Sequence, residues 1–261
     1  MPGSSTRIDV LIPAIPKDLV TLPHVINSIR KYVKHPIGRI MIIAPKNQRI
    51  IDFCRRKGCR FINEASVLPI GKKGIYSHTG RWNRAGWLYQ QLLKLSGDKL
   101  SSQRFFLVID ADTVLIRPHL FRINNKTVFY CRNWTHQEYK NAYRKLLGKR
   151  ATSPVSFVTH YMLFDRAKLS RLKRIIASRH NRNWYIAILD RINKTKPINF
   201  SEFETYGNFV RSHYPGAMII RSSMNKSLSS NFLSLSGKKV KKLARKYRSI
   251  SFHKRKIYFR K

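Results

Sequence analysis

Apolar and polar residues follow two different periods along the first half of the chain. Short runs that are almost wholly apolar predict strands that are buried on both faces. These runs are residues 8–13, 39–45, 59–64 and 104–110. Between them, apolar residues recur at helical spacing and predict amphipathic helices over residues 19–33, 47–58 and 83–95. Strands that alternate with helices predict parallel β-α-β units with right-handed crossovers.

The pattern in the second half of the chain is mixed. Strands are predicted at residues 126–131 and 160–165, and helices at residues 167–179, 183–192 and 202–214. From Gly237 onward the sequence has no acidic residue, and it predicts a basic helix followed by a closing strand or tail. The expected fold class is therefore α/β, a mixed, mostly parallel sheet flanked by helices.

The chain is strongly basic. Its 261 residues include 53 Lys and Arg but only 12 Asp and Glu, which gives a formal net charge of +41. This charge predicts attraction to nucleic acid, an acidic membrane surface or a phosphorylated substrate. Hydrophobic residues make up 43% of the chain, enough to fill a packed core, so the composition excludes disorder over most of its length.

The cysteines and the hydropathy of the chain indicate the cellular compartment in which the protein works. Cys54, Cys59 and Cys131 are odd in number and lack the spacing of zinc or redox pairs, which indicates reduced thiols in a cytosol. The proline-broken N-terminus does not resemble a signal peptide. No apolar run reaches the roughly 18 residues needed to span a bilayer. The glycine patterns of P-loop and Rossmann phosphate loops are also missing from the sequence.

Two acidic residues stand where the most apolar strand ends. Asp110 and Asp112, in FFLVIDADTVLIRP, are one residue apart, so in an extended segment their side chains point to the same side. The carboxyl edge of a parallel sheet is where such folds bind ligands. Paired carboxylates there suit Mg²⁺ or Mn²⁺, which takes further oxygens from a substrate diphosphate. Aspartate also commonly ends a strand and caps a turn without binding anything.

Four segments together resemble one family. GRWNRAGWLYQQLLKL, FLVIDADTVLIRP, HYMLFDRAKL and FSEFETYGNFV, in that order, resemble a bacterial group of nucleotide-sugar-dependent glycosyltransferases with the GT-A fold. The likeness runs from Ile8 to His253, and its S-E-x-E-x-Y-G element is fairly distinctive. The resemblance implies that Asp110 and Asp112 hold Mn²⁺ or Mg²⁺ and the donor diphosphate. It also implies one GT-A-like domain over residues 1–250, in which residues 237–261 form a basic helix and tail that close the site.

Further donor contacts are expected on both sides of this motif. IDVLIPAIPKD resembles the first strand of the GT-A fold, where the nucleotide base and ribose bind, and this implies a donor contact at Pro13. Arg81 and Arg84 lie three residues apart at the start of a predicted helix, so that both guanidinium groups could hold a diphosphate. A solvated basic face would explain the same arginines in so basic a chain.

Glutamates at the start of another predicted helix are candidate catalytic bases. Ser201 is a plausible N-cap for this helix, and Glu202 and Glu204 lie in its first turn. An inverting sugar transfer needs a carboxylate to accept the proton of the attacking hydroxyl. The resemblance implies that one of the two supplies it, and they face different ways on a helix. Acids in a first turn also complement the helix dipole without any catalytic role.

Histidines complete the candidate site. His253 resembles the C-terminal histidine with which many metal-dependent GT-A enzymes complete the coordination of the ion. Imidazole is a more natural ligand for Mn²⁺ than for Mg²⁺. His160 is a candidate contact for the acceptor or the donor sugar. The family often has a second histidine where Tyr161 stands in this chain.

The function expected from these features is metal-dependent transfer of a sugar from a UDP- or GDP-linked donor to the hydroxyl of a glycan or glycolipid. The setting implied is cell-surface polysaccharide or lipopolysaccharide synthesis in the cytoplasm, at the inner face of an anionic membrane that the basic C-terminal segment contacts. The alternatives are a basic nucleic-acid-binding protein, for which no recognised motif is present, and a nucleotidyltransferase, which also uses paired carboxylates. Sugar, acceptor and stereochemistry stay open at this point.

Overall fold

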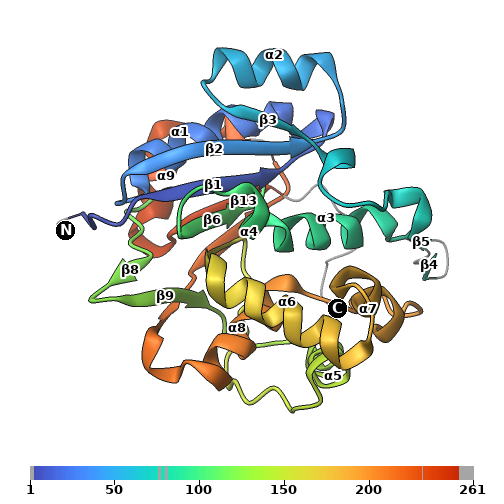
Figure 1. Cartoon of the computed structure of the whole chain (residues 1–261). Helices are drawn as coiled ribbons and strands as arrows, with labels where there is room; N and C mark the ends of the chain where they lie inside the picture. Colours follow the sequence, from blue (N-terminus) through green and yellow to red (C-terminus); the bar gives the residue numbers. More distant parts are fainter. Residues whose placement is uncertain (1–2, 76–77, 80–81, 231, 253–261) are drawn as a thin grey trace.

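A five-stranded sheet forms the centre of the computed structural model, which describes residues 3–75, 78–79, 82–230 and 232–252 (Figure 1). The strand order is β10-β6-β1-β2-β3, and the outer strand β10 runs antiparallel to its neighbour while the other pairs are parallel. The strands are β1 (Ile8–Pro13), β2 (Ile37–Ala44), β3 (Arg60–Asn63), β6 (Phe105–Ile109) and β10 (Tyr161–Asp165). The α/β class and the mixed, mostly parallel sheet expected from the sequence are confirmed.

Successive residues of the central strands pack into two different cores. Leu11 and Val108 belong to the core on one face of the sheet, whereas Val10 and Leu107 belong to the core on the other, and all four are fully buried. Because alternate side chains of a strand point to opposite faces, both faces need apolar residues. This is why the strands appear in the sequence as uninterrupted apolar runs.

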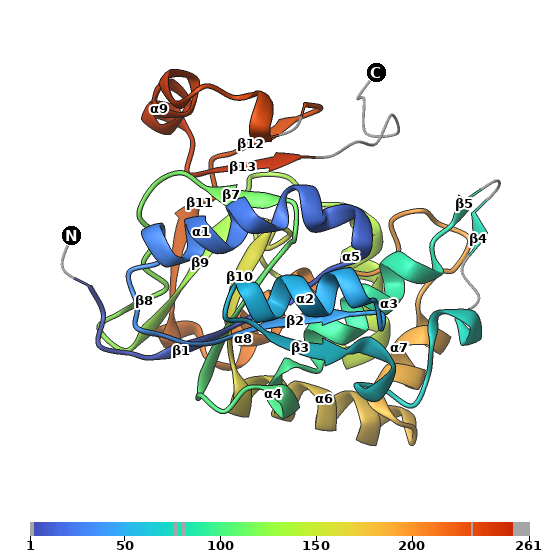
Figure 2. The same cartoon turned by 90° about the horizontal axis from the view of Figure 1, so that it is seen from above.

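Helices cover both faces of the sheet (Figures 1 and 2). Those that pack on the face of Val10 are α1 (Leu22–Tyr32), α2 (Gln48–Arg56) and α9 (Gly237–Lys246). Those that pack on the face of Leu11 are α3 (Ala85–Leu95), α5 (Gln137–Leu147), α6 (Arg166–His180), α7 (Trp184–Arg191) and α8 (Glu202–His213). Short helical segments are α4 (Gly97–Leu100), η1 (Pro16–Val20), η2 (Glu64–Ser66), η3 (Lys72–Gly74), η4 (Pro215–Ala217) and η5 (Phe232–Ser234).

Three smaller sheets lie outside the central one in the described part of the chain. One has the order β11-β9-β8, one β12-β13-β7 and one β4-β5. Their strands are β4 (His78–Thr79), β5 (Trp82–Asn83), β7 (Thr113–Leu115), β8 (Arg122–Ile123), β9 (Lys126–Cys131), β11 (Met218–Ser222), β12 (Asn225–Leu228) and β13 (Ser249–Phe252). The pairing of β13 with β7 brings the last described strand beside the segment that follows Asp112. In the described part of the chain, no helix is both long and apolar enough to span a membrane.

Gly207, the glycine of the S-E-x-E-x-Y-G element, lies where close packing leaves no room for a side chain. A Cβ at Gly207, in the middle of α8, would overlap the buried ring of Phe157. We expect Gly207→Ala to lower the free energy of unfolding by about 1–3 kcal/mol, the usual cost of overpacking a core. Gly86→Ala on α3 is the matched control, because nothing lies within 4 Å of its Cβ position. That control should gain up to about 1 kcal/mol from helix propensity. Urea unfolding of both variants measures the difference, and equal stabilities would contradict the packing role.

Candidate functional site

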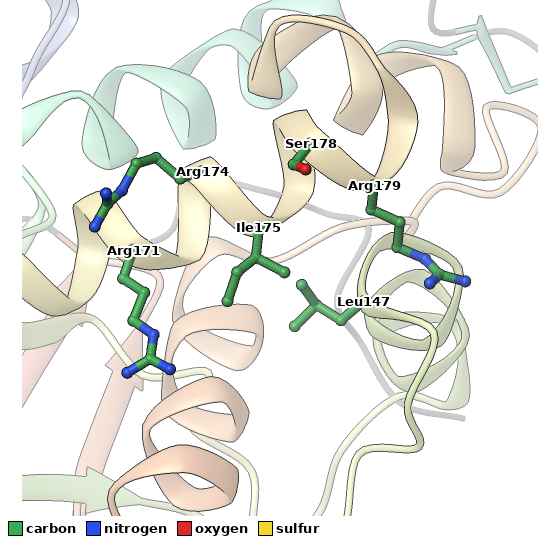
Figure 3. A pocket seen from close by; sticks show the side chains of 6 residues that line it. All are labelled: Leu147, Arg171, Arg174, Ile175, Ser178 and Arg179. Carbon is green, nitrogen blue, oxygen red and sulfur yellow. The ribbon is translucent and has the colours of Figure 1, made fainter.

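A hollow of about 640 Å³ lies between the end of α5 and α6 (Figure 3). Its lining residues are Leu147, Arg171, Arg174, Ile175, Ser178 and Arg179. Two of its arginines have structural partners, since Arg171 donates to the Tyr214 hydroxyl at 2.9 Å and the Arg179 guanidinium packs against Gly148. None of the described residues singled out for donor or metal binding lines this hollow.

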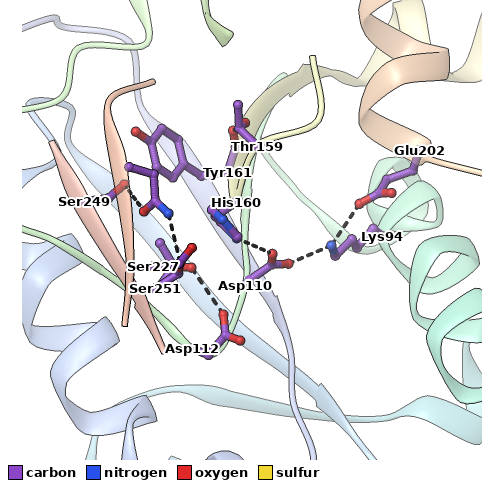
Figure 4. Close-up of polar contacts among 12 residues, drawn as sticks. Lys94, Asp110, Asp112, Thr159, His160, Tyr161, Glu202, Ser227, Ser249 and Ser251 are labelled. Carbon is purple, nitrogen blue, oxygen red and sulfur yellow. Dashed lines mark hydrogen bonds and ion pairs between the residues drawn. The ribbon is translucent and has the colours of Figure 1, made fainter. Parts of the chain in front are cut away.

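The candidate site lies instead at the end of β6, where two aspartates and a histidine come together (Figure 4). Asp110, Asp112 and His160 each offer one ligand atom, and these atoms lie within 4.8 Å of one another. The side chains of Asp110 and His160 are 22% and 19% exposed, and Nδ1 of His160 lies 3.3 Å from Oδ2 of Asp110. Below, Asp110, Asp112 and His160 are called the acidic cluster.

The backbone explains why these residues meet. Tyr161 pairs with Ile109 across the antiparallel strands β10 and β6, so the residue before β10 lies beside the residue after β6. The Asp110 N–H donates to the His160 carbonyl at 2.9 Å, and the Thr113 N–H closes a turn onto the Asp110 carbonyl at 3.1 Å. Ala111, between the aspartates, is buried in the core. The two carboxylates approach each other through this turn, whereas the sequence argument assumed an extended segment.

A buried ammonium lies directly beneath the acidic cluster. Nζ of Lys94, near the end of α3, is 2.7 Å from Oδ1 of Asp110 and 2.8 Å from Oε1 of Glu202. The side chains of Lys94 and Glu202 are only 4% and 2% exposed. The cation thus joins the first turn of α8 to the end of β6 and fixes the orientation of Asp110 (Figure 4).

The contacts of Lys94 with Asp110 and Glu202 favour the charged forms of Lys94 and Asp110. Burial alone would lower the pKa of Lys94, but the carboxylates of Asp110 and Glu202 outweigh it and raise that pKa. Burial alone would raise the pKa of Asp110, but Lys94 and His160 outweigh it and lower that pKa well below its ordinary value. The pKa of Glu202 is raised by burial, which Lys94 offsets only in part.

Other side chains on the same face of α3 extend this network. With its amide oriented to satisfy both neighbours, Gln91 donates to the Glu202 carboxylate and accepts from Nε1 of Trp87 at 3.2 Å. The Arg84 guanidinium stacks over Trp87, with its Cζ 4.4 Å from the ring centroid. Spacings of three and four residues place all of these side chains on one face of a helix. Arg84 is the N-cap of α3, so it lies at the far end of the helix from Lys94.

The short helix that follows β1 contributes another acid. Asp18, in η1, accepts a hydrogen bond from the Ile15 N–H at 2.9 Å. Burial raises the pKa of Asp18, and repulsion from Asp112 and Asp110 adds to the rise. Asp18 therefore lies close enough to the acidic cluster for the two carboxylates to repel its own. Pro13, the expected donor contact, is the last residue of β1, is buried, and pairs with Ile43.

The two candidate bases have different surroundings. Glu202 belongs to the Lys94 network, whereas Glu204 accepts hydrogen bonds from Ser156 Oγ at 2.9 Å and the Phe157 N–H at 2.8 Å. Thr135 and Asn208 also donate to Glu204, at 3.3 and 3.2 Å. Glu204 is fully buried, and its partners anchor the loop before β10. The contacts therefore connect Glu202, and not Glu204, to the acidic cluster.

The last described strand reaches the acidic cluster as well. The Phe252 N–H donates to the Asp112 carbonyl at 3.0 Å, and Ser251 pairs with Thr113. His253, the expected additional metal ligand, and Arg81, the expected diphosphate contact, both lie outside the described residues. Tyr161 points away from the cluster into the core, where it packs against His119 and Tyr130.

The donor atoms of the acidic cluster fit a divalent metal. Carboxylate oxygens with one imidazole suit Mn²⁺ in particular, and the partly exposed face leaves room for oxygens from a substrate. Other buried acids have purely structural partners. Asp9 accepts from the Arg39 and Ser102 N–H groups, and Asp165 caps α6. Asp110 and Asp112 differ from these because they converge with a histidine at the sheet edge.

Comparison with known proteins places the chain in a family. The sequence model of a family of unknown function, DUF6492, matches residues 6–225, so the chain belongs to that family. No curated protein matches the sequence. Mouse xyloside xylosyltransferase 1, in its apo form, is similar in structure over 94% of this chain and 97% of its own, at a TM-score of 0.51 and 9% identity.

A second similar structure is an active-site mutant of LgtC, matched over 94% of this chain and 87% of its own, at a TM-score of 0.50 and 13% identity. A complex of the galactosyltransferase LgtC with donor and acceptor sugar analogs has a TM-score of 0.49 at 12% identity. At such identities the first two matches show the fold alone. The chain has the GT-A-like fold of these transferases.

Proposed function

We propose that this member of the DUF6492 family is a metal-dependent glycosyltransferase that moves a sugar from a nucleotide-diphosphate sugar to a hydroxyl acceptor. The observation that carries the proposal is the convergence of Asp110, Asp112 and His160 at the carboxyl edge of the parallel strands. That edge is where open α/β sheets bind ligands. The GT-A-like fold and the resemblance of the sequence motifs support the same reaction.

Each residue of the site has a distinct task in this proposal. Asp110 and Asp112 would hold Mn²⁺ or Mg²⁺, with His160 as a further ligand. Bound there, the dication would neutralise charge that develops on the departing diphosphate. Lys94 keeps the Asp110 carboxylate ionised and in place, because its ammonium lies 2.7 Å from Oδ1. His253 as an additional ligand, and Arg81 and Arg84 as diphosphate contacts, stay predictions.

Glu202 contacts Lys94, and Lys94 in turn contacts Asp110, so Glu202 can influence the acidic cluster through Lys94. Its carboxylate is 2% exposed and is held by Lys94 and Gln91, so the contacts support a positioning role for it. The base role predicted for Glu202 in an inverting transfer requires the acceptor to reach this buried layer. The acceptor that we propose, a cell-surface glycan or glycolipid, rests on the motif resemblance.

The distribution of positive charge argues against a nucleic-acid-binding protein. The basic helices α5 and α6 pack on one face of the central sheet, whereas the basic helix α9 packs on the other (Figure 2). A single nucleic acid strand or duplex follows a continuous basic track. The two groups of cations are separated by the thickness of the sheet and its helices.

A thermal-shift panel of nucleoside diphosphates with and without Mn²⁺ tests the proposed function. A ligand that binds only the folded state raises its melting temperature. We expect one nucleoside diphosphate to raise the melting temperature by several degrees with Mn²⁺ and by much less without it. A panel in which no nucleotide stabilises the protein in the presence of Mn²⁺ would overturn the proposal.

A further inference from the structure

Helix α9 separates its cations from its apolar residues completely. Six of its ten residues are exposed lysines or arginines: Lys238, Lys239, Lys241, Lys242, Arg245 and Lys246. At about 100° per residue, these six side chains fall within an arc of about 160° of the helix surface. Val240, Leu243 and Ala244 occupy the opposite side and pack against the core. The six cations are called the cationic face of α9 below.

The segment that contains α9 has no acidic residue of its own. The last acidic residue of the chain is Glu204, so the whole segment from η4 to the end of α9 contains only neutral and basic residues. The helix lies at the periphery of the molecule, on the opposite side from α6 (Figure 2). Fixed charges of one sign on an exposed face attract an anionic surface over about 8 Å at physiological salt.

An apolar side chain is exposed in the segment that precedes α9. Leu233, in η5 just before α9, is 72% exposed, the highest value among the large exposed hydrophobic residues of the described chain. An exposed leucine a few residues before a cationic helix is suited to the boundary between lipid headgroups and acyl chains. The apolar side of α9 itself is already covered by the protein core, so the helix would rest on a surface and only Leu233 would enter it.

The composition of the face favours lipid over nucleic acid. Five of its six cations are lysines, which act as hydrated point charges, whereas bidentate recognition of phosphates and bases uses arginine. None of the exposed residues of α9 is aromatic, so it offers no ring on which a base could stack. A diffuse negative surface is the partner that such a face matches.

We propose that the cationic face of α9 and Leu233 dock the protein on an anionic phospholipid leaflet. The docking face is joined closely to the acidic cluster. Arg248 follows α9 by two residues, and its carbonyl accepts from the Ile116 N–H at 2.9 Å. β13 then pairs with β7 beside Asp112. If the proposed function holds, docking orients the acidic cluster relative to an acceptor carried by the same leaflet.

Sedimentation with vesicles tests the proposal. The wild-type protein should bind vesicles of phosphatidylcholine with 30 mol% phosphatidylglycerol at low salt, lose that binding at high salt, and ignore pure phosphatidylcholine. The test variant carries Lys238→Gln, Lys241→Gln, Lys242→Gln and Arg245→Gln. Each basic side chain near a leaflet contributes roughly a factor of five, so the four changes should weaken binding on the order of 100-fold or more.

A matched control removes the same charge from the other side of the sheet. It carries Arg144→Gln, Lys145→Gln, Lys149→Gln and Arg174→Gln, at exposed positions on or next to α5 and α6. This control should bind the vesicles within a few-fold of wild type. Equal losses in both variants would show that net charge alone drives binding, and would overturn the assignment to α9. The salt and lipid dependence of the wild type tests the proposal even if the α9 variant fails to fold.

Two further outcomes separate this proposal from its alternatives. Leu233→Ser should weaken vesicle binding by several-fold without affecting the melting temperature. If duplex DNA displaces the protein from vesicles and the α9 variant loses DNA affinity to the same degree, the face is a nucleic acid site and the proposal is wrong. Vesicle binding needs neither metal nor nucleotide, so its failure leaves the thermal-shift test of the proposed function unaffected.

Discussion

Asp112→Asn is expected to abolish donor turnover while the protein stays folded. The substitution keeps the shape of the side chain but removes the charge that one ligand of the acidic cluster offers to a dication. A bound metal supplies several kcal/mol of stabilisation to a departing diphosphate, and about 1.4 kcal/mol is a factor of ten in rate. We therefore expect turnover of the nucleotide-sugar donor to fall by roughly 10³-fold.

Asp112 is a cleaner test than Asp110. Removing the Asp110 carboxylate would also leave Lys94 without one of its ion-pair partners. A loss of activity in that variant could then come from lost stability as well as from lost metal binding. Asp190→Asn is the matched control, because Asp190 forms an exposed ion pair with Arg182 far from β6 in the sequence. The control should keep full activity, and the melting temperatures of both variants should stay close to wild type. An Asp112→Asn protein with wild-type turnover would remove the metal assignment.

Lys94→Met is expected to have the largest effect on stability. It leaves Asp110 and Glu202 without the ammonium that lies 2.7 and 2.8 Å from them. Removing one partner of a buried ion pair typically costs about 3–5 kcal/mol, because the remaining charge is buried without compensation. Denaturant unfolding at pH 7 measures the loss. A variant as stable as wild type would show that Lys94 does not hold these carboxylates.

The pH dependence of the Lys94→Met protein gives a second readout. Without the ammonium, burial raises the folded-state pKa of both carboxyl groups above their unfolded-state values. A group whose folded pKa is raised contributes more stability as pH falls. The stability gap between variant and wild type should therefore narrow between pH 7 and pH 5. Adding Glu202→Gln to Lys94→Met should recover part of the loss at pH 7, since it removes one of the two uncompensated charges.

The sequence predicts the central sheet well because its strands are buried on both faces. β1 has the same bounds in the structure as in the apolar pattern, and the predicted runs for β6 and β10 extend at most one residue beyond either end of the observed strands. The position of Asp110 and Asp112 at a strand end follows from the same reasoning. These features depend only on local sequence, so a run of apolar residues and its terminal acids are enough to locate them.

Contacts between distant segments could not be predicted in this way. Lys94 appears in the sequence as one cation among the leucines of α3, and only the packing of α3 against β6 and α8 shows that it meets Asp110 and Glu202. His160 was expected at a sugar, and the antiparallel return of β10 places it against Asp110. The order of strands in a sheet is set by the whole fold, so local patterns do not reveal it.

One helix was missed although its pattern is present. Residues 139–150 stand out in the sequence as a basic cluster, and the structure forms α5 there. Tyr139, Ala142, Tyr143 and Leu146 recur at helical spacing and are buried against the core. Lys140, Arg144 and Lys145 lie between them and make the segment resemble a solvated basic run. The edge strands β11 and β12 are partly exposed, so their apolar signal is weak.

Electron paramagnetic resonance of Mn²⁺ tests the central claim most directly. The protein is titrated into Mn²⁺ with the nucleoside diphosphate that the thermal-shift panel identifies, and the Asp112→Asn variant is measured beside it. We predict that wild type replaces the spectrum of hydrated Mn²⁺ with a bound signal that shows coupling to phosphorus, and that the variant does not. A wild-type protein that leaves the hydrated spectrum unchanged at millimolar concentration would contradict the account.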